Sequence, residues 1–249
     1  MLTSGKAMNL DLNEYLENVI DDIGGLGLFQ WMLIIIVLGS KASVVWSILM
    51  MEFGGATPDW YCDWKTEAGD NYTLNKQYNK ICSWDNTSIS LVCAEKHFDP
   101  EMATVVSEWE LVCDRDWITA TITTIQMGGL LFGGFISGQI ADTYGRKLTY
   151  YLSLFGLLVF SAVAAFSTSW QMFAMLRFFI GIGCGFYTTI FFTYLIEFTP
   201  RKYRSMIISI PSWPFWAIIF GLMSWRLHNW MFIQIATAVV TLPWFIGFK

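Results

Sequence analysis

Six apolar segments, each long enough to cross a lipid bilayer, constrain this chain more than any other feature. A bilayer-spanning helix needs about 20 mostly apolar residues. The segments are residues 28–50, 117–141, 148–167, 172–196, 205–225 and 230–248. Only 14% of the 249 residues are charged, whereas a soluble domain carries about 25%. The chain therefore cannot cover itself with polar surface, and we predict an all-α membrane protein with six transmembrane helices.

The polar segment 51–116 separates the first apolar segment from the second. It contains thirteen acidic and five basic residues, four of the five cysteines and both N-glycosylation sequons. Disulfides and N-linked glycans form on the lumenal or extracellular side, so we expect an extracellular loop that is glycosylated at Asn71 and Asn86. The cysteines are Cys62, Cys82, Cys93 and Cys113. They allow three disulfide pairings, which the sequence does not distinguish, and four free thiols are the alternative.

Neither a metal site nor a catalytic site is expected. The polar segment has no C-x-x-C pair and a single histidine, His97, which disfavours zinc. No nucleophile is paired with a base, and the other histidine, His228, also falls in a loop. The basic residues are few and scattered, so nucleic acid is not a partner. We expect no cofactor and no enzymatic activity.

The charges at the segment ends predict the orientation. Residues 1–27 carry one basic residue against five acidic ones, which excludes a signal peptide; they form either a short amphipathic segment or a tail. Short cytoplasmic loops are rich in Lys and Arg. Arg146, Lys147, Arg201, Lys202, Arg204 and Lys249 lie on one side, and Arg226 alone lies on the other. We therefore expect the loops 142–147 and 197–204, and both termini, in the cytoplasm.

Several residues within the apolar segments are candidates for special roles. Lys41 lies near the middle of the first segment, where a charge must face a wet cavity or a partner; a lysine that extends along the bundle is the alternative. Gly129, Gly133 and Gly134 provide a thin face for close helix packing. Pro211 and Pro214 are expected to bend the fifth segment. Asp142 and Arg146, like Glu197 and Arg201, stand four apart and could pair on one helical turn.

Six stretches together resemble the organic cation, zwitterion and anion transporters of the major facilitator superfamily. The G-x-x-x-D-x-x-G-R-K pattern at 138–147 resembles the signature loop between helices 2 and 3 of that superfamily. The other stretches are GLFQ at 27–30, TPD at 57–59 followed by Cys62, SEWELVCD at 107–114, LRFFIG at 176–181 and the charged loop at 197–204. The large loop after the first helix is also typical of the family.

The resemblance implies an architecture of two six-helix halves, of which this chain contains the N-terminal one. A missing C-terminal half, on the same full-length chain, would then be its partner within the lipid bilayer, and we expect the chain to be a fragment. In the superfamily the loop Asp caps a helix end, and the Arg and Lys pair across the two halves. The residues expected to control conformation are Gly138, Asp142, Gly145, Arg146, Lys147, Arg177, Glu197, Arg201 and Arg204. Arg177 lies near the outer end of its helix, where an interfacial arginine is the alternative.

The resemblance also implies the function, which is transport of a small organic ion by alternating access at the plasma membrane. The expected path residues are Lys41, Val44, Ile48, Met127, Thr188, Phe192 and Ser212; each could equally serve packing. A carnitine- or choline-type cation or zwitterion is the first expectation. Tyr187, Phe191 and Phe192 could hold a quaternary ammonium by cation–π attraction; that most of them face lipid is the alternative. Lys41 favours a zwitterion or an anion. An organic anion transporter and a non-transporting glycoprotein whose loop binds a partner are the alternatives.

Overall fold

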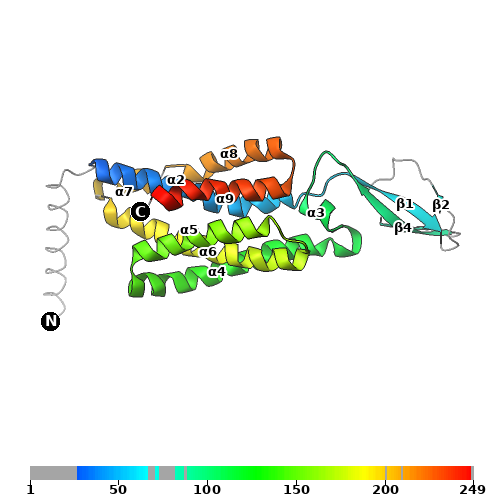
Figure 1. The fold of residues 1–249 in the computed structure, drawn as a ribbon, viewed down its shortest axis with the longest axis horizontal. Coiled ribbons are helices and arrows are strands. Elements are labelled where there is room, and N and C mark those ends of the chain that lie inside the picture. The colour runs from blue at the N-terminus through cyan, green and yellow to red at the C-terminus, as the bar shows by residue number, and fades with distance from the viewer. Residues whose placement is uncertain are drawn as a thin grey trace.

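The computed structural model describes residues 27–66, 71–72, 82–86, 89–199, 201–208 and 210–247. Residues 1–26, and with them nearly all of the expected N-terminal segment, lie outside this part of the chain. The helices of the bundle run side by side along one axis, and a small β-sheet extends beyond one end (Figure 1). We name the polypeptide between the first two long helices the loop domain, and its end of the bundle the loop-domain end.

Six helices or helix pairs within the described residues are long and apolar enough to cross a membrane. They are α2 (Leu28–Gly54), α4 (Trp117–Tyr144), α5 (Arg146–Ala164), α6 (Trp170–Phe198), the pair α7 (Arg201–Ile208) and α8 (Ser212–Leu227), and α9 (Trp230–Gly247). The predicted number and order of spans are confirmed. Most boundaries move by a few residues, because helix ends continue into the polar flanks that hydropathy alone excludes.

The fifth span is interrupted rather than gently bent. α7 ends at Ile208 and α8 begins at Ser212, so the break falls at Pro211, whose missing N–H cannot continue a helix. Pro214 lies in the first turn of α8, where the missing N–H costs no intrahelical hydrogen bond. The prediction of a bend is therefore correct at Pro211 and wrong at Pro214.

Close packing of α4 against α6 depends on glycines from both helices. A Cβ built on Gly129 would lie 2.2 Å from the Phe178 carbonyl oxygen, and one on Gly181 would lie 2.1 Å from the Gln126 carbonyl oxygen. Gly133 is equally restricted, by Ile182. A Cβ on Gly134, in contrast, would meet only Thr189, at 3.9 Å. The predicted thin face is thus confirmed at Gly129 and Gly133 and does not extend to Gly134.

The loop domain carries a four-stranded antiparallel sheet in the order β2-β1-β4-β3. Its strands are β1 (Trp60–Thr66), β2 (Asn71–Tyr72), β3 (Ser83–Asn86) and β4 (Ile89–Phe98). Residues 99–113, which we name the stem, lead from the sheet back to the bundle and contain α3 (Val105–Glu108); the turn η1 (Cys113–Arg115) follows. The sequence predicted the loop and its disulfides but not a sheet, because strand length and register were not expected from so polar a segment.

The stem is fixed to the bundle by backbone and aromatic contacts. The Ala103 N–H donates to the His228 carbonyl at 3.0 Å, and the Trp230 N–H donates to the Ala103 carbonyl at 3.1 Å. Trp109 packs against Phe173 of α6 and Trp230 of α9, with ring centroids 5.4 Å away in both cases. The stem therefore belongs to the same packed unit as the ends of α6 and α9.

Candidate functional site

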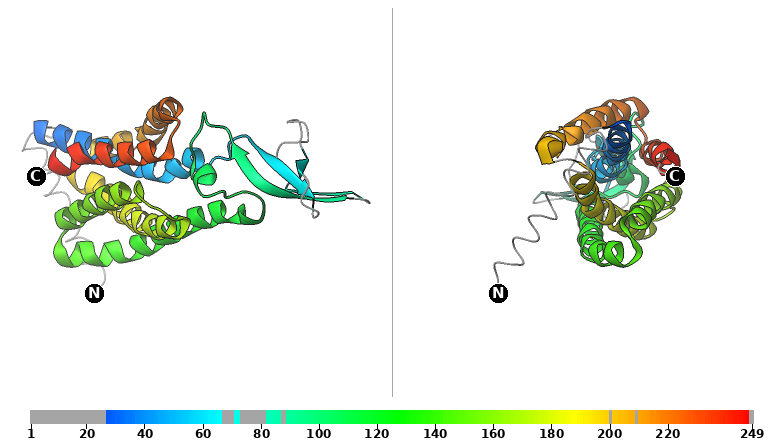
Figure 2. Two further views of the ribbon diagram at one scale, coloured as in Figure 1. Left: turned by 45° about the vertical axis from the view of Figure 1, so that its right-hand side comes forward. Right: turned by 90° about the vertical axis from the view of Figure 1, so that its left-hand side faces the viewer.

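Lys41 lies near the middle of α2, a helix that packs against α6, α8 and α9. The end-on view in Figure 2 shows α2, in blue, among the other helices of the bundle. The Lys41 ammonium donates a hydrogen bond to the Ser212 hydroxyl at 3.0 Å and lies over the Phe191 ring, 4.7 Å from the centroid. The side chain is half-buried. No carboxylate among the residues that the structure describes pairs with it. Because an ammonium has three donors and one is used here, Lys41 retains the capacity to bind a further acceptor.

The other predicted path residues divide between the surface and the core. Ser212 is buried beside Lys41, and Thr188 is half-buried, with its hydroxyl donating to the Cys184 carbonyl at 2.8 Å. Phe192 and Met127 are exposed, Phe192 at 51%. Val44, however, is 1% exposed, and Ile48 packs against the core. In this conformation Val44 therefore does not line an open surface.

The three aromatic residues of α6 have different environments. Tyr187 is buried, and its hydroxyl donates to the Val37 carbonyl at 2.7 Å. Phe191 is also buried and already faces the Lys41 ammonium. Of the three, only Phe192 is exposed. Tyr187 and Phe191 therefore offer no free face to a quaternary ammonium in this conformation, because the protein itself covers both rings.

Arg177 is completely buried among α2, α4 and α6. One guanidinium nitrogen, Nη1, donates to the Ser47 carbonyl at 2.9 Å and to Gln126 Oε1 at 3.3 Å, while Nη2 contacts the Met50 sulfur. The Phe173 ring lies 5.0 Å from the guanidinium carbon. Gln126 also donates to the Ser47 carbonyl, at 3.0 Å. Arg177 is therefore not an interfacial arginine; it joins three helices without an acidic partner among the described residues.

A second buried polar cluster joins α2, α5 and α6, and the sequence analysis missed it. The Ser40 hydroxyl lies 2.9 Å from the Tyr187 hydroxyl and also contacts the Tyr150 hydroxyl. Tyr150 packs against Tyr187 and Tyr194, with ring centroids at 5.6 Å and 5.9 Å. Tyrosines in apolar segments gave no sign of this cluster, because only the packing of three helices brings their hydroxyls together.

The charged loop between α4 and α5 is a tight break at Gly145. This residue has φ +90°, a conformation that favours glycine, and Tyr144 and Arg146 on either side belong to different helices. Asp142, exposed in the last turn of α4, therefore does not share a helical turn with Arg146, and the structure shows no ion pair between them. The predicted i,i+4 pairing is wrong because Gly145 redirects the chain.

The loop at 197–204 also separates two helices. α6 ends at Phe198 and α7 begins at Arg201, so Glu197 and Arg201 also belong to different helices. The side chains of Glu197, Arg201 and Arg204 lie outside the described part of the chain. Gly138 has open space around its Cα, and Lys147 is exposed. The two breaks lie at the end of the bundle opposite the loop domain (Figure 1).

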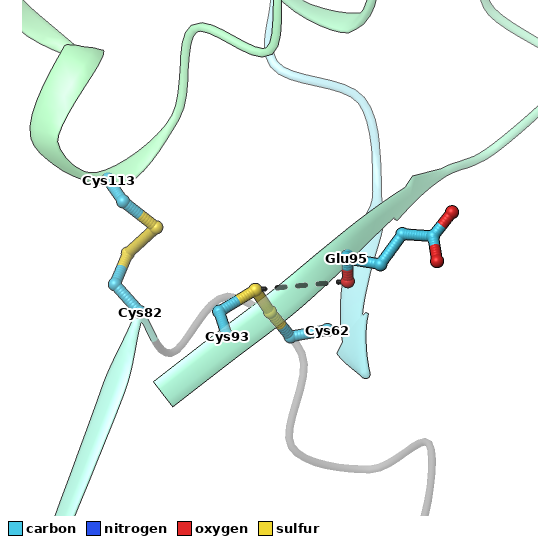
Figure 3. The surroundings of a disulfide bond; sticks show 5 residues. All are labelled: Cys62, Cys82, Cys93, Glu95 and Cys113. Carbon is cyan, nitrogen blue, oxygen red and sulfur yellow. Dashed lines mark hydrogen bonds between the residues drawn. A yellow bond between two sulfur atoms is a disulfide. The ribbon is translucent and has the colours of Figure 1, made fainter. Parts of the chain in front are cut away.

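The four loop cysteines form two disulfides (Figure 3). Cys62 bonds Cys93, joining β1 to β4, and Cys82 bonds Cys113 at the end of the stem; both pairs have a Cα–Cα distance of 5.6 Å. The prediction of paired cysteines is confirmed. The fifth cysteine, Cys184, is buried and unbonded in α6. The Asn71 and Asn86 side chains lie outside the described part of the chain, so their glycosylation stays a prediction.

The arrangement of the helices identifies the structural class of this chain. A solved structure of the xylose transporter XylE from E. coli, in an inward-open conformation, has the same fold, with a TM-score of 0.56 at 12% sequence identity. The match covers 89% of this chain and 48% of the xylose transporter. The described helices therefore form about one half of a major facilitator transporter fold, as predicted.

The sequence comparisons then give the family. Residues 60–248 match the family described as "Sugar (and other) transporter", and the chain belongs to this family. Solute carrier family 22 member 16 of Xenopus laevis is 32% identical over 152 residues, covering 59% of this chain and 27% of that protein. The organic cation transporter protein of Drosophila melanogaster is 27% identical over 254 residues, covering 91% and 46%. The chain thus matches less than half the length of either relative.

These relatives confirm the resemblance to organic-ion carriers. A third relative, solute carrier family 22 member 4 of Mus musculus, is 31% identical over 153 residues, and the match covers 58% of this chain and 28% of that protein. Because the relatives are transporters, the prediction that this chain is not an enzyme is confirmed as well.

Proposed function

We propose that this chain forms the N-terminal half of a transporter that moves small organic ions across the plasma membrane by alternating access. The observation that supports this most directly is Lys41, a half-buried cation at the centre of α2 with no carboxylate partner among the described residues. A charge at this depth is costly unless it faces water or a partner. Substrate sites of such transporters lie near the bilayer midplane, between the repeats. The path therefore passes Lys41, Ser212, Thr188 and Phe192.

The surroundings of Lys41 favour a substrate that carries a carboxylate. A simple cation would be repelled by the ammonium, and the Phe191 face that could attract it is covered by Lys41. A carboxylate, in contrast, can accept from the remaining ammonium donors, and the exposed Phe192 ring can contact an organic or quaternary ammonium part. We therefore favour a carnitine-like zwitterion or an organic anion over a choline-like cation.

Alternating access requires a second six-helix unit, which would close the cavity against this one. In this arrangement the loop domain is extracellular, and the breaks at 142–147 and 197–204 are cytoplasmic. The position of Asp142 supports the presence of such a second unit. Its carboxylate is exposed at the carboxyl end of α4, where the helix dipole disfavours negative charge, so it needs stabilisation from outside this half. The amino end of a helix in the second half would stabilise it. Arg146 and Lys147 would pair in the same interface.

The substrate proposal is tested by uptake of carnitine, choline and a dicarboxylate in cells that express the complete transporter with this chain. Lys41→Ala should reduce uptake of the two carboxylate-bearing compounds and leave choline uptake unchanged or higher. Lys96→Ala, in the loop domain, is the matched control. If Lys41→Ala changes none of the three uptakes relative to surface protein, Lys41 does not touch substrate and the charge argument fails.

A further inference from the structure

Two stripes of small polar residues lie on the buried faces of α2 and α9. On α2 the stripe is Ser40, Ser43 and Ser47; on α9 it is Gln234, Thr237 and Thr241. In both helices the residues follow the i, i+3, i+7 spacing of one helix face. Every one of them is at most 1% exposed. Two helices could pack here through apolar faces alone, so the presence of buried polar residues on both faces needs a physical explanation.

Ser43 and Ser47 face the α9 stripe because α2 and α9 pack antiparallel in a constant register, whereas the Ser40 hydroxyl contacts Tyr150 and Tyr187. At the loop-domain end, a Cβ on Gly54 would lie 3.5 Å from the Trp230 Cβ; at the other end, a Cβ on Gly39 would overlap the Trp244 ring. Gly54 and Trp230 lie at the same height, so positions can be counted from them towards the other end of the bundle. One turn from this pair, Gln234 is level with Met50. Thr237 is level with Ser47 two turns down, and Thr241 is level with Ser43 three turns down.

Polar atoms in this seam lack partners within the protein. Both amide atoms of Gln234 and the hydroxyls of Ser43 and Ser47 are buried and form no hydrogen bond in the part of the chain that the structure describes. The Thr237 and Thr241 hydroxyls donate to carbonyls of their own helix at 2.9 Å, and their oxygens can still accept. Buried polar groups in proteins are nearly always paired, with protein or with ordered water.

We propose that the α2–α9 seam is an internal water-binding site, centred on Gln234 and extending towards Ser47 and Ser43. Water fits because it both donates and accepts, and Gln234 together with the serine hydroxyls supplies the two to four partners that a buried water uses. A cation fits less well: α9 has no acidic residue, and the only one on α2, Glu52, is exposed. Arg177, which binds the Ser47 carbonyl, adds further positive charge nearby.

The seam ends beside a cavity. A cavity of about 170 Å³ lies at the loop-domain end of α2, α8 and α9, lined by Gly54, Ser224 and Ile233 among others. Ile233 immediately precedes Gln234. Gln234 itself does not line this cavity, and the seam lies apart from Lys41, whose ammonium contacts Ser212 and Phe191.

Radiolytic footprinting of the purified chain in lipid nanodiscs tests the proposal. Short X-ray pulses split bound water, and the hydroxyl radicals oxidise the nearest reactive side chain. Met50 is level with Gln234 and fully buried, while its neighbour Met51 is also buried but packs beside Gly55. We expect Met50 to be oxidised several-fold faster than Met51. Gln234→Leu, which removes the amide at similar volume, should lower Met50 oxidation to the Met51 rate.

Exposed Met175 serves as the internal standard, since its oxidation should be the same in both proteins. Gln234→Ile provides a second variant that removes the amide at similar volume, and it should behave as Gln234→Leu does. Equal oxidation of Met50 and Met51 in the unaltered chain would overturn the proposal, and so would Met50 oxidation that survives both substitutions. General unfolding is recognised because Met51 oxidation would then rise together with that of Met50.

Discussion

Arg177 shows how a single side chain can determine the packing of three helices. A guanidinium without an acidic partner is costly in a bundle interior, and here its donors reach the Ser47 carbonyl and Gln126. Both contacts come from Nη1, while the planar fork of the guanidinium places Nη2 at the Met50 sulfur. The position of Arg177 near the end of its segment was readable from the sequence. Its burial was not, since the acceptors come from residues far away in the chain.

Arg177→Lys should destabilise the protein although it keeps the charge. The lysine side chain is one bond shorter than the arginine side chain as far as Nη1, so its ammonium cannot take the position from which Nη1 donates to both the Ser47 carbonyl and Gln126. A lost hydrogen bond to a charged group costs roughly 1.5–3 kcal/mol. We expect a clear decrease in the midpoint of thermal unfolding of the detergent-solubilised chain. Arg226→Lys, at an exposed position in the last turn of α8, should leave the midpoint unchanged. Equal midpoints for Arg177→Lys and the unaltered chain would contradict this role.

Helix-level features were the most predictable part of the molecule. Apolar length predicted all six spans, and the glycine spacing in α4 predicted a close contact, because both depend on local sequence. The pairing of Asp142 with Arg146 failed for a local reason too: Gly145 adopts φ +90° and ends the helix between them. The partner face of the α4 glycines, the tyrosine cluster at Ser40 and the pairing of α2 with α9 depend on tertiary packing, which periodicity does not specify.

Gly181→Ala tests the contact between α4 and α6. The new methyl group would lie 2.1 Å from the Gln126 carbonyl oxygen, so the helices must separate, and overpacking of this kind costs about 1–3 kcal/mol. We expect a lower unfolding midpoint. Gly128→Ala, where nothing lies within 4 Å, should instead raise it slightly, because alanine is favoured over glycine in a helix by about 0.5–1 kcal/mol. The same direction of change in both variants would rule out the packing argument.

Asp142→Asn tests the conformational role of the α4–α5 break. The exposed carboxylate has no ion-pair partner among the described residues of this half, so the substitution should not affect folding. In the complete transporter, we expect uptake per surface molecule to fall more than surface expression does. Arg146→Ala should do the same. Uptake and expression that stay normal in both variants would mean that these charges only orient the protein in the membrane.

On the scale of the whole molecule, the disulfide pairing and the glycans provide a test of topology. Cys62–Cys93 and Cys82–Cys113 place all four thiols of the loop domain in bonds, which requires an oxidising compartment. Glycosidase treatment of the protein from cultured cells should increase its gel mobility in two steps, and Asn71→Gln and Asn86→Gln should each remove one step. Four thiols that react with an alkylating agent without prior reduction, together with no mobility shift, would reverse the proposed orientation.

The stem gives the sheet a mechanical connection to the helices. Trp109 lies between Phe173 and Trp230, and Phe173 in turn packs under the guanidinium of Arg177. We expect a tilt of α6 and α9 in the membrane to move the stem with them, and the displacement to grow with distance along the sheet. The loop domain therefore reports on the orientation of the helical half. An antibody fragment bound to the loop domain would convert small rotations within the bilayer into displacements large enough to follow on single molecules.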